Sequence, residues 1–221
     1  MSVQKFIHDN SLMLTMFTIF ACALIGMSLA GWAASNNDLA QHDQATESYG
    51  KYVTSGEFIE GIFENWESEF LQMWALIILT VYLHQKGSAD SKPLRGKAPQ
   101  ETNSRYSILR AASWSQRKKA IGHTLYSHSL GLAMLGLFVV SFSLHAIGGT
   151  AAYNEENKLH HSEVVSVGQY VVSSQFWYES LQNWQSEFLA IGALLVLSIK
   201  LRERGSPESK PVGKKFDHET G

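Results

Sequence analysis

The chain has 221 residues, of which 45% are hydrophobic and 17% charged, and its formal net charge at pH 7 is −2. This net charge by itself says nothing about partners, and no nucleic-acid partner is expected, because membrane topology and anionic lipid headgroups explain the basic residues more simply. The single cysteine, Cys22, excludes a disulfide framework and a CxxC metal or redox site. The mean hydropathy of −0.09 resembles that of a soluble domain, but it averages apolar and basic segments that are separated along the chain.

The first apolar segment, residues 12–32, contains 21 residues without a charge. A helix needs roughly 20 residues to cross a hydrocarbon core of about 30 Å, so this segment is predicted to be a transmembrane helix. A cleaved signal peptide is the alternative, because Lys5 precedes the segment and small residues follow it. We favour the helix, since the core of a signal peptide usually has only about 7–15 apolar residues.

A second apolar segment follows a predicted outer loop over residues 35–56. It runs from Phe70 to Leu83, which is too short to cross a membrane unless the helix begins near Asn65. Glu69 would then lie inside the outer leaflet, about 21 Å above the inner boundary at a rise of about 1.5 Å per residue. A carboxylate at that depth is costly and normally faces the interior of a helix bundle, a partner or water.

Basic residues are concentrated in two segments, with nine of the 18 Lys and Arg in residues 86–119 and six in residues 200–215. Segments rich in Lys and Arg beside transmembrane helices stay in the cytoplasm, so both termini and the central linker are predicted to be cytoplasmic. Residues 108–119 of this linker are amphipathic and are predicted to form a helix on the inner membrane surface.

The second half of the chain repeats the first half at an offset of 118 residues. The segment NWESEFL at residues 65–71 returns as NWQSEFL at 183–189, and GSADSKP at 87–93 returns as GSPESKP at 205–211. A third apolar segment, residues 130–152, corresponds to the first one and cannot be a signal peptide, because it lies in the middle of the chain. Internal repeats of this kind decide the architecture of a protein.

These features together predict an all-α membrane protein with four transmembrane helices in two tandem repeats. Each repeat makes an even number of passes, so both copies have the same orientation and are related by a pseudo-twofold axis along the membrane normal. The predicted boundaries are residues 1–97 for the first repeat, 98–122 for a basic cytosolic linker, 123–204 for the second repeat and 205–221 for a disordered cytosolic tail.

The repeat turns one membrane-embedded carboxylate into a pair, Glu69 and Glu187. Side chains at i, i+3 and i+4 share a helix face, so an Asn and a Ser accompany each Glu. The predicted ion- or ligand-binding residues are Glu69, Glu187, Asn65, Asn183, Ser68 and Ser186. The alternative is structural, since Asn and Ser hydrogen bonds hold helices together in lipid and the helix dipole favours Glu near an N-terminus.

Histidines suggest two further hypotheses. His42 and His160 are repeat equivalents in the predicted outer loops, and with the two Glu residues they could bind zinc, iron or manganese. Met27 and His145 occupy equivalent positions in the first and third apolar segments, and Met with His is a known pair of haem axial ligands. Solvated loop histidines and a buried His bonded to a neighbouring helix are the structural alternatives, so we expect no cofactor.

The duplicated NWxSEFL and GSx(D/E)SKP motifs, with the YNEE element at residues 153–156, resemble a bacterial integral membrane family of unknown function, DUF6766. The resemblance covers nearly the whole chain and implies a location in the bacterial cytoplasmic (inner) membrane. It implies no activity, substrate or cofactor. Family members are similar in carrying Gln before the Ser-Glu pair. Here Glu67 replaces that Gln in the first copy, whereas Gln185 keeps it in the second, so the two copies are not strictly equivalent.

Three functions remain open. The first is ion, proton or small-solute handling by Glu69 and Glu187, in a homodimer if one chain is too small for a pathway. The second is a structural or accessory subunit of a larger membrane complex. The third is a metal- or haem-dependent membrane oxidoreductase. The chain lacks a Walker loop, a GxSxG elbow, an HExxH motif and a strand followed by GxGxxG, which argues against an enzyme. The lipid bilayer is the partner that all three functions share.

Overall fold

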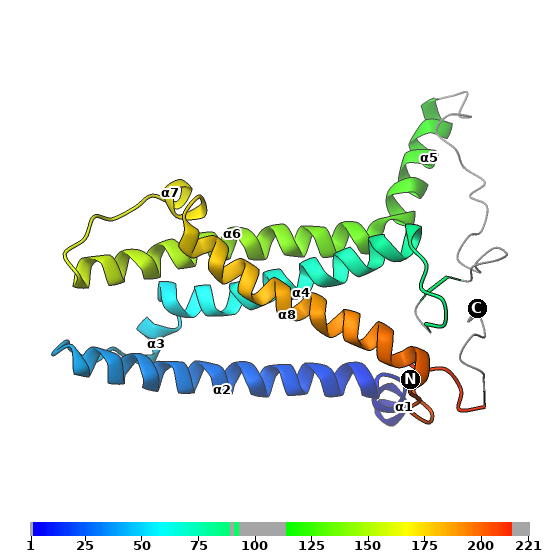
Figure 1. Ribbon diagram of the computed structural model, residues 1–221, viewed down its shortest axis with the longest axis horizontal. Helices are drawn as coiled ribbons and strands as arrows, with labels where there is room; N and C mark the ends of the chain where they lie inside the picture. Colours follow the sequence, from blue (N-terminus) through cyan, green and yellow to red (C-terminus); the bar gives the residue numbers. More distant parts are fainter. Residues whose placement is uncertain (1, 89–90, 93–113, 214–221) are drawn as a thin grey trace. The chain divides into compact units, whose positions relative to one another are not determined.

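The computed structural model describes residues 2–88, 91–92 and 114–213. All regular secondary structure in these ranges is α-helical, which confirms the predicted all-α fold (Figure 1). The helices are α1 (Val3–Asp9), α2 (Ser11–Gln41), α3 (Tyr49–Tyr52), α4 (Gly56–Tyr82), α5 (Trp114–Ser127), α6 (Ser129–Leu159), α7 (Val167–Val171) and α8 (Ser174–Lys200).

Two sequence-based predictions fall partly outside the described residues. The basic linker lies outside them up to residue 113, and the tail lies outside them over residues 214–221. Within the segment predicted to be an amphipathic linker helix, the described part begins with α5 at Trp114.

Helices α2 and α6 are long and apolar enough to cross a membrane, as judged by length and composition, and each has 31 residues. Among the described helices, these two meet both criteria, whereas four spans were predicted. Helices α4 and α8 are long enough but are not apolar enough, because their first halves carry several Glu, Gln and Asn side chains. With 27 residues each, α4 and α8 are nevertheless about 40 Å long at about 1.5 Å per residue.

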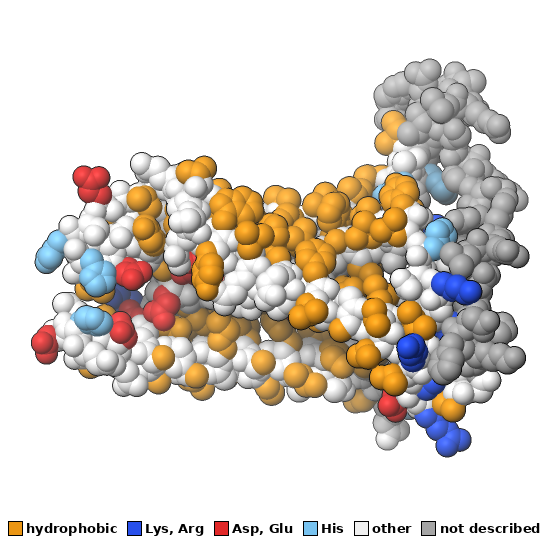
Figure 2. Space-filling view, viewed as in Figure 1, with side chains coloured by type: hydrophobic (Ala, Val, Ile, Leu, Met, Phe, Trp, Pro, Cys, Tyr) orange, Lys and Arg blue, Asp and Glu red, His pale blue; other side chains and the backbone are white. Residues whose placement is uncertain are grey.

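The distribution of polar side chains is the reverse of that in a water-soluble protein. Among the described residues, four hydrophobic side chains are buried but eleven polar or charged ones are. In α2, large hydrophobic side chains such as Leu12 (71% exposed) and Phe17 (66% exposed) face outward, and Ser28 is the buried residue. Figure 2 shows hydrophobic side chains along the length of α2. Small and polar residues inside with apolar residues outside are expected for helices surrounded by lipid.

Contacts divide the chain into two units. The first unit comprises Met1–Ile62 and Leu144–Tyr170, and the second comprises Phe63–Ser143 and Val171–Gly221. Each unit therefore combines residues from both of the repeats predicted from the sequence.

In the first unit, an asparagine near the end of α2 holds the loop that follows this helix. Asn36 Nδ2 donates to Glu47 O at 3.1 Å, and Glu47 N donates to Asn36 Oδ1 at 2.7 Å. The same pair of bonds follows α6, where Asn154 and Val165 are joined at 2.8 and 2.7 Å. One asparagine side chain thus satisfies both backbone groups of a loop residue at each of these turns.

Glycines bring the start of α4 against α6 in the same unit. A Cβ atom added to Gly148 would lie 2.7 Å from the backbone N of Glu60 and 2.7 Å from Ile59 Cγ2. A Cβ atom on Gly56 would lie 2.5 Å from the backbone N of Ala152. Small residues allow helix backbones to approach this closely, which is the usual way that helices pack in membranes.

In the second unit, aromatic side chains join α6 to α8. The rings of Phe138 and Trp184 are 6.3 Å apart, and those of Phe142 and Phe176 are 5.2 Å apart, both edge to face. Such pairs stabilise a contact by about 0.5–1.5 kcal/mol beyond the burial of their area. This packing fixes the position of α8 within the unit.

The second Ser of the GSx(D/E)SKP motif accepts a hydrogen bond from the backbone just after both α4 and α8. Ser91 Oγ accepts a hydrogen bond from Gln85 N at 2.7 Å, and Ser209 Oγ accepts one from Glu203 N at 3.0 Å. Gly205 has φ of +87°, a conformation that residues other than glycine rarely adopt. The second copy of the motif thus takes part in a hydrogen-bonded turn after α8.

Candidate functional site

Two carboxylates of α4 accept hydrogen bonds from α8 in the second unit. Asn183 Nδ2 donates to Glu64 Oε1 at 2.6 Å. Trp184 Nε1 donates to Glu67 Oε1 at 3.1 Å. Consecutive residues of α8 thus bond to carboxylates that are one helical turn apart on α4.

A third bond joins the same two helices further along. Gln72 Nε2 donates to the backbone O of Glu187 at 3.0 Å, and the Gln72 side chain is buried. We call the residues that make these three bonds the polar interface. Its members are Glu64, Glu67, Gln72, Asn183, Trp184 and Glu187.

Glu67 is the most deeply buried member of the polar interface. It is 0% exposed, and no other acidic side chain among the described residues is buried. Its donor, Trp184, packs against Phe138 and, at a ring separation of 6.1 Å, against Trp177. Burying a carboxylate among aromatic rings is costly unless hydrogen bonds compensate for the lost water. The buried carboxylate of Glu67 is therefore a candidate group for binding a proton or an ion.

The predicted carboxylate pair lies beside this interface. Glu69 and Glu187 are close enough for their charges to interact. The Glu69 residue is exposed, whereas Glu187 is half-buried. The two residues are therefore electrostatic neighbours on α4 and α8.

The predicted Asn and Ser residues make different contacts from one another. Ser68 Oγ donates to Asn65 O at 2.7 Å, and Ser186 Oγ donates to Asn183 O at 2.8 Å, so both hydroxyls bond to the backbone of their own helix. Asn65 is exposed. Asn183 donates a hydrogen bond to the carboxylate of Glu64.

The first unit contains a second polar cluster, formed by the half-buried Glu60 with His145 and Tyr170. Tyr170 Oη donates to Glu60 Oε1 at 3.0 Å, and ligand atoms of Glu60 and His145 lie within 4.8 Å of one another. His145 is 0% exposed and Tyr170 1%. Gly149 makes room for the phenol, since a Cβ atom there would lie 2.6 Å from Tyr170 Oη. Imidazole and carboxylate are ligand types that zinc, iron and manganese accept.

The other histidines and the methionine proposed as ligands lie in more open positions. His42 and His160 are both exposed, and His42 Nδ1 lies 3.0 Å from the backbone O of Asp38 on its own helix. Met27 is 40% exposed, and its methyl group lies against Gly61 of α4. His42 is thus engaged locally at the end of α2.

Comparison with known families now adds to this geometry. The family model described as a domain of unknown function, DUF6766, matches residues 3–221. The chain belongs to the DUF6766 family. The resemblance inferred from the duplicated motifs is therefore confirmed. No curated protein and no solved structure matches the chain.

An acidic cluster surrounds the start of α4 in the first unit of this DUF6766 protein. Burial raises the pKa of the Glu57 carboxyl above its ordinary value of 4.5. The negative charges of Glu47, Asp38 and Glu155 raise this pKa further. A hydrogen bond from Ser35 opposes the shift. Glu57 therefore holds its proton more tightly in the folded protein than in an unfolded chain.

Sequence reasoning missed Glu64 and regarded Glu67 only as a departure from the DUF6766 pattern. It relied on identity between the two copies, which selects Glu69 and Glu187. The available signal was instead a difference between the copies. The first copy carries Glu57, Glu60, Glu64 and Glu67 where the second carries Gln175, Tyr178, Gln182 and Gln185. Spacings of three, four and three residues put these four Glu side chains on one face of α4.

Proposed function

We propose that this DUF6766 protein is an integral protein of the bacterial inner membrane with both termini in the cytoplasm. Helices α2, α4, α6 and α8 would be its four spans. The apolar composition of α2 and α6 supports this proposal, as does the burial of polar rather than apolar side chains. At about 40 Å, α4 and α8 are long enough for a core of about 30 Å.

The turns that follow α2 and α6 support the proposed repeat. Each is closed by an asparagine that bonds both backbone groups of a residue eleven positions later. Each also has a residue in the left-handed region at the same point, Asp43 with φ of 55° and His161 with φ of 54°. Matching turns favour two copies of one helical hairpin in the same orientation, related by a pseudo-twofold axis along the membrane normal.

For the activity, we propose ion or proton handling by carboxylates at and beside the polar interface. The observation that carries this proposal is Glu67, which is fully buried. An ionisable residue within a membrane helix is costly and is usually kept for a function. Glu69 and Glu187, whose charges interact, supply two further carboxylates that can attract a cation.

Flux into proteoliposomes tests the proposal. Protons would be followed with an internal pH dye, and Na⁺ and K⁺ with gradients of each ion. Glu67→Gln, Glu69→Gln and Glu187→Gln each remove one charge and keep the shape of the side chain. We expect each variant to lose at least about tenfold in rate, equivalent to about 1.4 kcal/mol in the barrier. Glu203→Gln, at an exposed position after α8, is the matched control and should keep the rate of the unmodified protein.

Two results would contradict ion handling. One is full flux in all three carboxamide variants. The other is the absence of flux of protons, Na⁺ and K⁺ through the unmodified protein when its reconstitution has been verified.

The second candidate is a structural or accessory subunit of a larger membrane complex. The bonds from Asn183 to Glu64 and from Trp184 to Glu67 favour it, because such bonds hold helices together in lipid. In that case Glu67→Gln would change stability or co-purifying partners, and the unmodified protein would carry no flux. Metal analysis and the visible absorption spectrum of the purified protein test the third alternative, an oxidoreductase.

A further inference from the structure

A groove runs between the C-terminal halves of α4 and α8, both of which belong to the second unit. It encloses a cavity of about 240 Å³. Most of its lining is aliphatic or aromatic. These apolar residues are Leu76, Leu79, Leu83, Phe188, Ile191 and Leu195.

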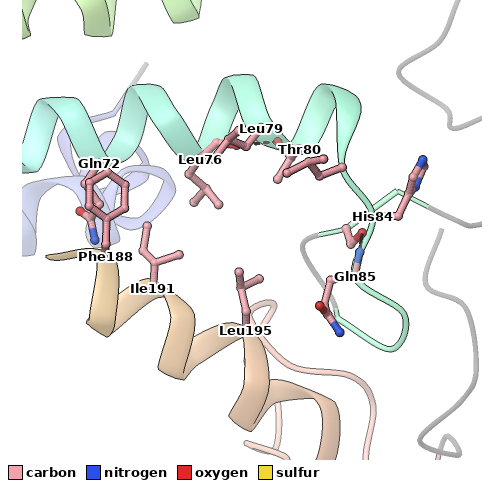
Figure 3. Close-up of a pocket in the computed structure, with 11 residues that line it drawn as sticks. Gln72, Leu76, Leu79, Thr80, His84, Gln85, Phe188, Ile191 and Leu195 are labelled. Atoms are coloured by element: carbon pink, nitrogen blue, oxygen red, sulfur yellow. Dashed lines mark hydrogen bonds between the residues drawn. The ribbon is translucent and has the colours of Figure 1, made fainter. Parts of the chain in front are cut away.

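The groove begins where the two helices are bonded together. At that end Gln72 donates to the backbone of Glu187. Beyond it, residues three and four positions apart turn one face of each helix toward the other. Figure 3 shows Leu76, Ile191 and Leu195 pointing into the space between the helices. The groove therefore has a polar contact at one end and runs from there toward the helix C-termini.

The length of the groove corresponds to one leaflet of a bilayer. From Gln72 to Leu83, α4 rises by about 16 Å at about 1.5 Å per residue. Half of a hydrocarbon core of about 30 Å is about 15 Å. A chain that fills the groove from end to end would thus cross one leaflet.

The cross-section of the groove is too small for a helix as occupant. Counting all empty space up to its open side, the groove measures about 710 Å³, which over about 16 Å corresponds to a mean cross-section on the order of 44 Å². An α-helix with its side chains is about 10–12 Å across, so its cross-section is roughly twice as large. A single hydrocarbon chain is the kind of occupant that suits such a slot.

The open end of the groove is polar and is followed by basic residues. His84, Gln85 and Ser91 line this end, and the bond from Gln85 N to Ser91 Oγ shapes the turn there. Lys86 is exposed on this turn, and Lys92 Nζ lies 3.1 Å from the backbone O of Val81 at the end of α4. Basic side chains at the end of a transmembrane helix attract anionic lipid headgroups by about 1 kcal/mol each.

We propose that this groove binds one anionic phospholipid, with an acyl chain along Leu76, Ile191 and Leu195 and the phosphate at the Lys86 end. The inference rests on the proposed insertion and orientation in the inner membrane, which place the open end at the cytoplasmic headgroups. It is independent of the proposed ion flux. The apolar walls select a hydrocarbon chain, the length selects one leaflet, and the basic end selects a negative headgroup.

The test is a lipid titration of the purified full chain in mild detergent, followed by native mass spectrometry. The probes are dioleoyl phosphatidylglycerol, which is anionic, and dioleoyl phosphatidylcholine, which has no net charge. We expect one phosphatidylglycerol per chain, bound at least about fivefold more tightly than phosphatidylcholine, as about 1 kcal/mol per basic residue implies.

Two variants and a control locate the bound lipid. Ile191→Trp fills the groove and should abolish binding of the phospholipid. Leu194→Trp adds the same ring three residues later on α8, at a side chain that is 48% exposed and outside the lining, and should bind as before. Lys86→Gln, at an exposed position, should leave the fold intact and remove most of the preference for phosphatidylglycerol.

The possible outcomes separate this proposal from the proposed function. Membrane insertion is checked first, by extraction of the chain from membranes with detergent but not with carbonate. A chain that is not inserted overturns both the membrane assignment and the lipid site. For an inserted chain, the absence of bound lipid, equal binding of both lipids or equal loss in both tryptophan variants overturns the lipid site alone.

Discussion

The side-chain amide of Asn183 lies 2.6 Å from Glu64 Oε1, which is the shortest of the bonds that define the polar interface between α8 and α4. Hydrogen bonds to charged acceptors are shorter and stronger than neutral ones. The repeat equivalent of Asn183 is Asn65, which is exposed. The position equivalent to Glu64 in the second copy is the neutral residue Gln182, so the two copies differ in the charge of this residue.

Replacing Asn183 by Leu should destabilise the protein. The substitution keeps the size of the side chain but removes the donor to the Glu64 carboxylate. We expect the free energy of unfolding to fall by about 1–3 kcal/mol, the usual cost of losing a hydrogen bond to a charged group. Denaturant titration in detergent, followed by tryptophan fluorescence, measures this change. Asn37→Leu, at an exposed position of α2, is the control, and an equal loss in both variants would argue against a special role for Asn183.

Trp184 and Glu67 share one hydrogen bond, but we expect substitutions at the two residues to change stability by different amounts. Trp184→Phe keeps an aromatic ring against Phe138 but removes the N–H donor, so stability should fall by about 1–3 kcal/mol. Glu67→Gln keeps an acceptor oxygen and removes a buried charge, so it should cost less or even stabilise the fold. Chemical unfolding of both variants measures the difference. A loss for Glu67→Gln as large as that for Trp184→Phe would refute this account.

Two glycines of α6 should respond differently to alanine. At Gly148 a new Cβ atom would lie 2.7 Å from the backbone N of Glu60, so Gly148→Ala should cost about 1–3 kcal/mol through overpacking. At Gly136 a new Cβ atom meets nothing within 4 Å, so Gly136→Ala should be neutral or stabilise the helix by about 0.5–1 kcal/mol. Thermal unfolding in detergent compares the two variants. The prediction fails if Gly148→Ala is as stable as Gly136→Ala.

The acidic cluster at the start of α4 predicts a dependence of stability on pH. Because the pKa of Glu57 is raised in the folded protein, the stability from its bound proton is fully present below about pH 4.5. That contribution is lost as the pH rises through the raised pKa of the folded state. Glu57→Gln removes this group, so the melting temperature of the variant should fall less steeply above pH 4.5. Melting temperatures between about pH 4 and 8 test the effect.

A matched control for Glu57→Gln is Glu163→Gln, which removes one negative charge from an exposed position in the loop after α6. This control should reproduce the pH profile of the unmodified chain. If both variants flatten the profile equally, total charge rather than the surroundings of Glu57 accounts for it.

Helix positions could be predicted well where the sequence has uninterrupted apolar segments. Residues 12–32 and 130–152 lie inside α2 and α6, because a long apolar run has few stable alternatives to a helix. The start of α4 at Gly56 could not be predicted in the same way. Its first two turns contain Gly56 and Gly61, and glycine is unfavourable in a helix, so the local sequence does not favour a helix there.

The sequence by itself determined the family, the all-α fold and the two apolar helices, since composition and local periodicity encode these properties. Which carboxylate is buried was decided only by the tertiary structure. Glu64, Glu67 and Glu69 lie within two turns of α4, and the face that α8 covers selects Glu67 for complete burial. That selection depends on contacts between residues more than 110 positions apart, which the spacing of residues within a single helix does not specify.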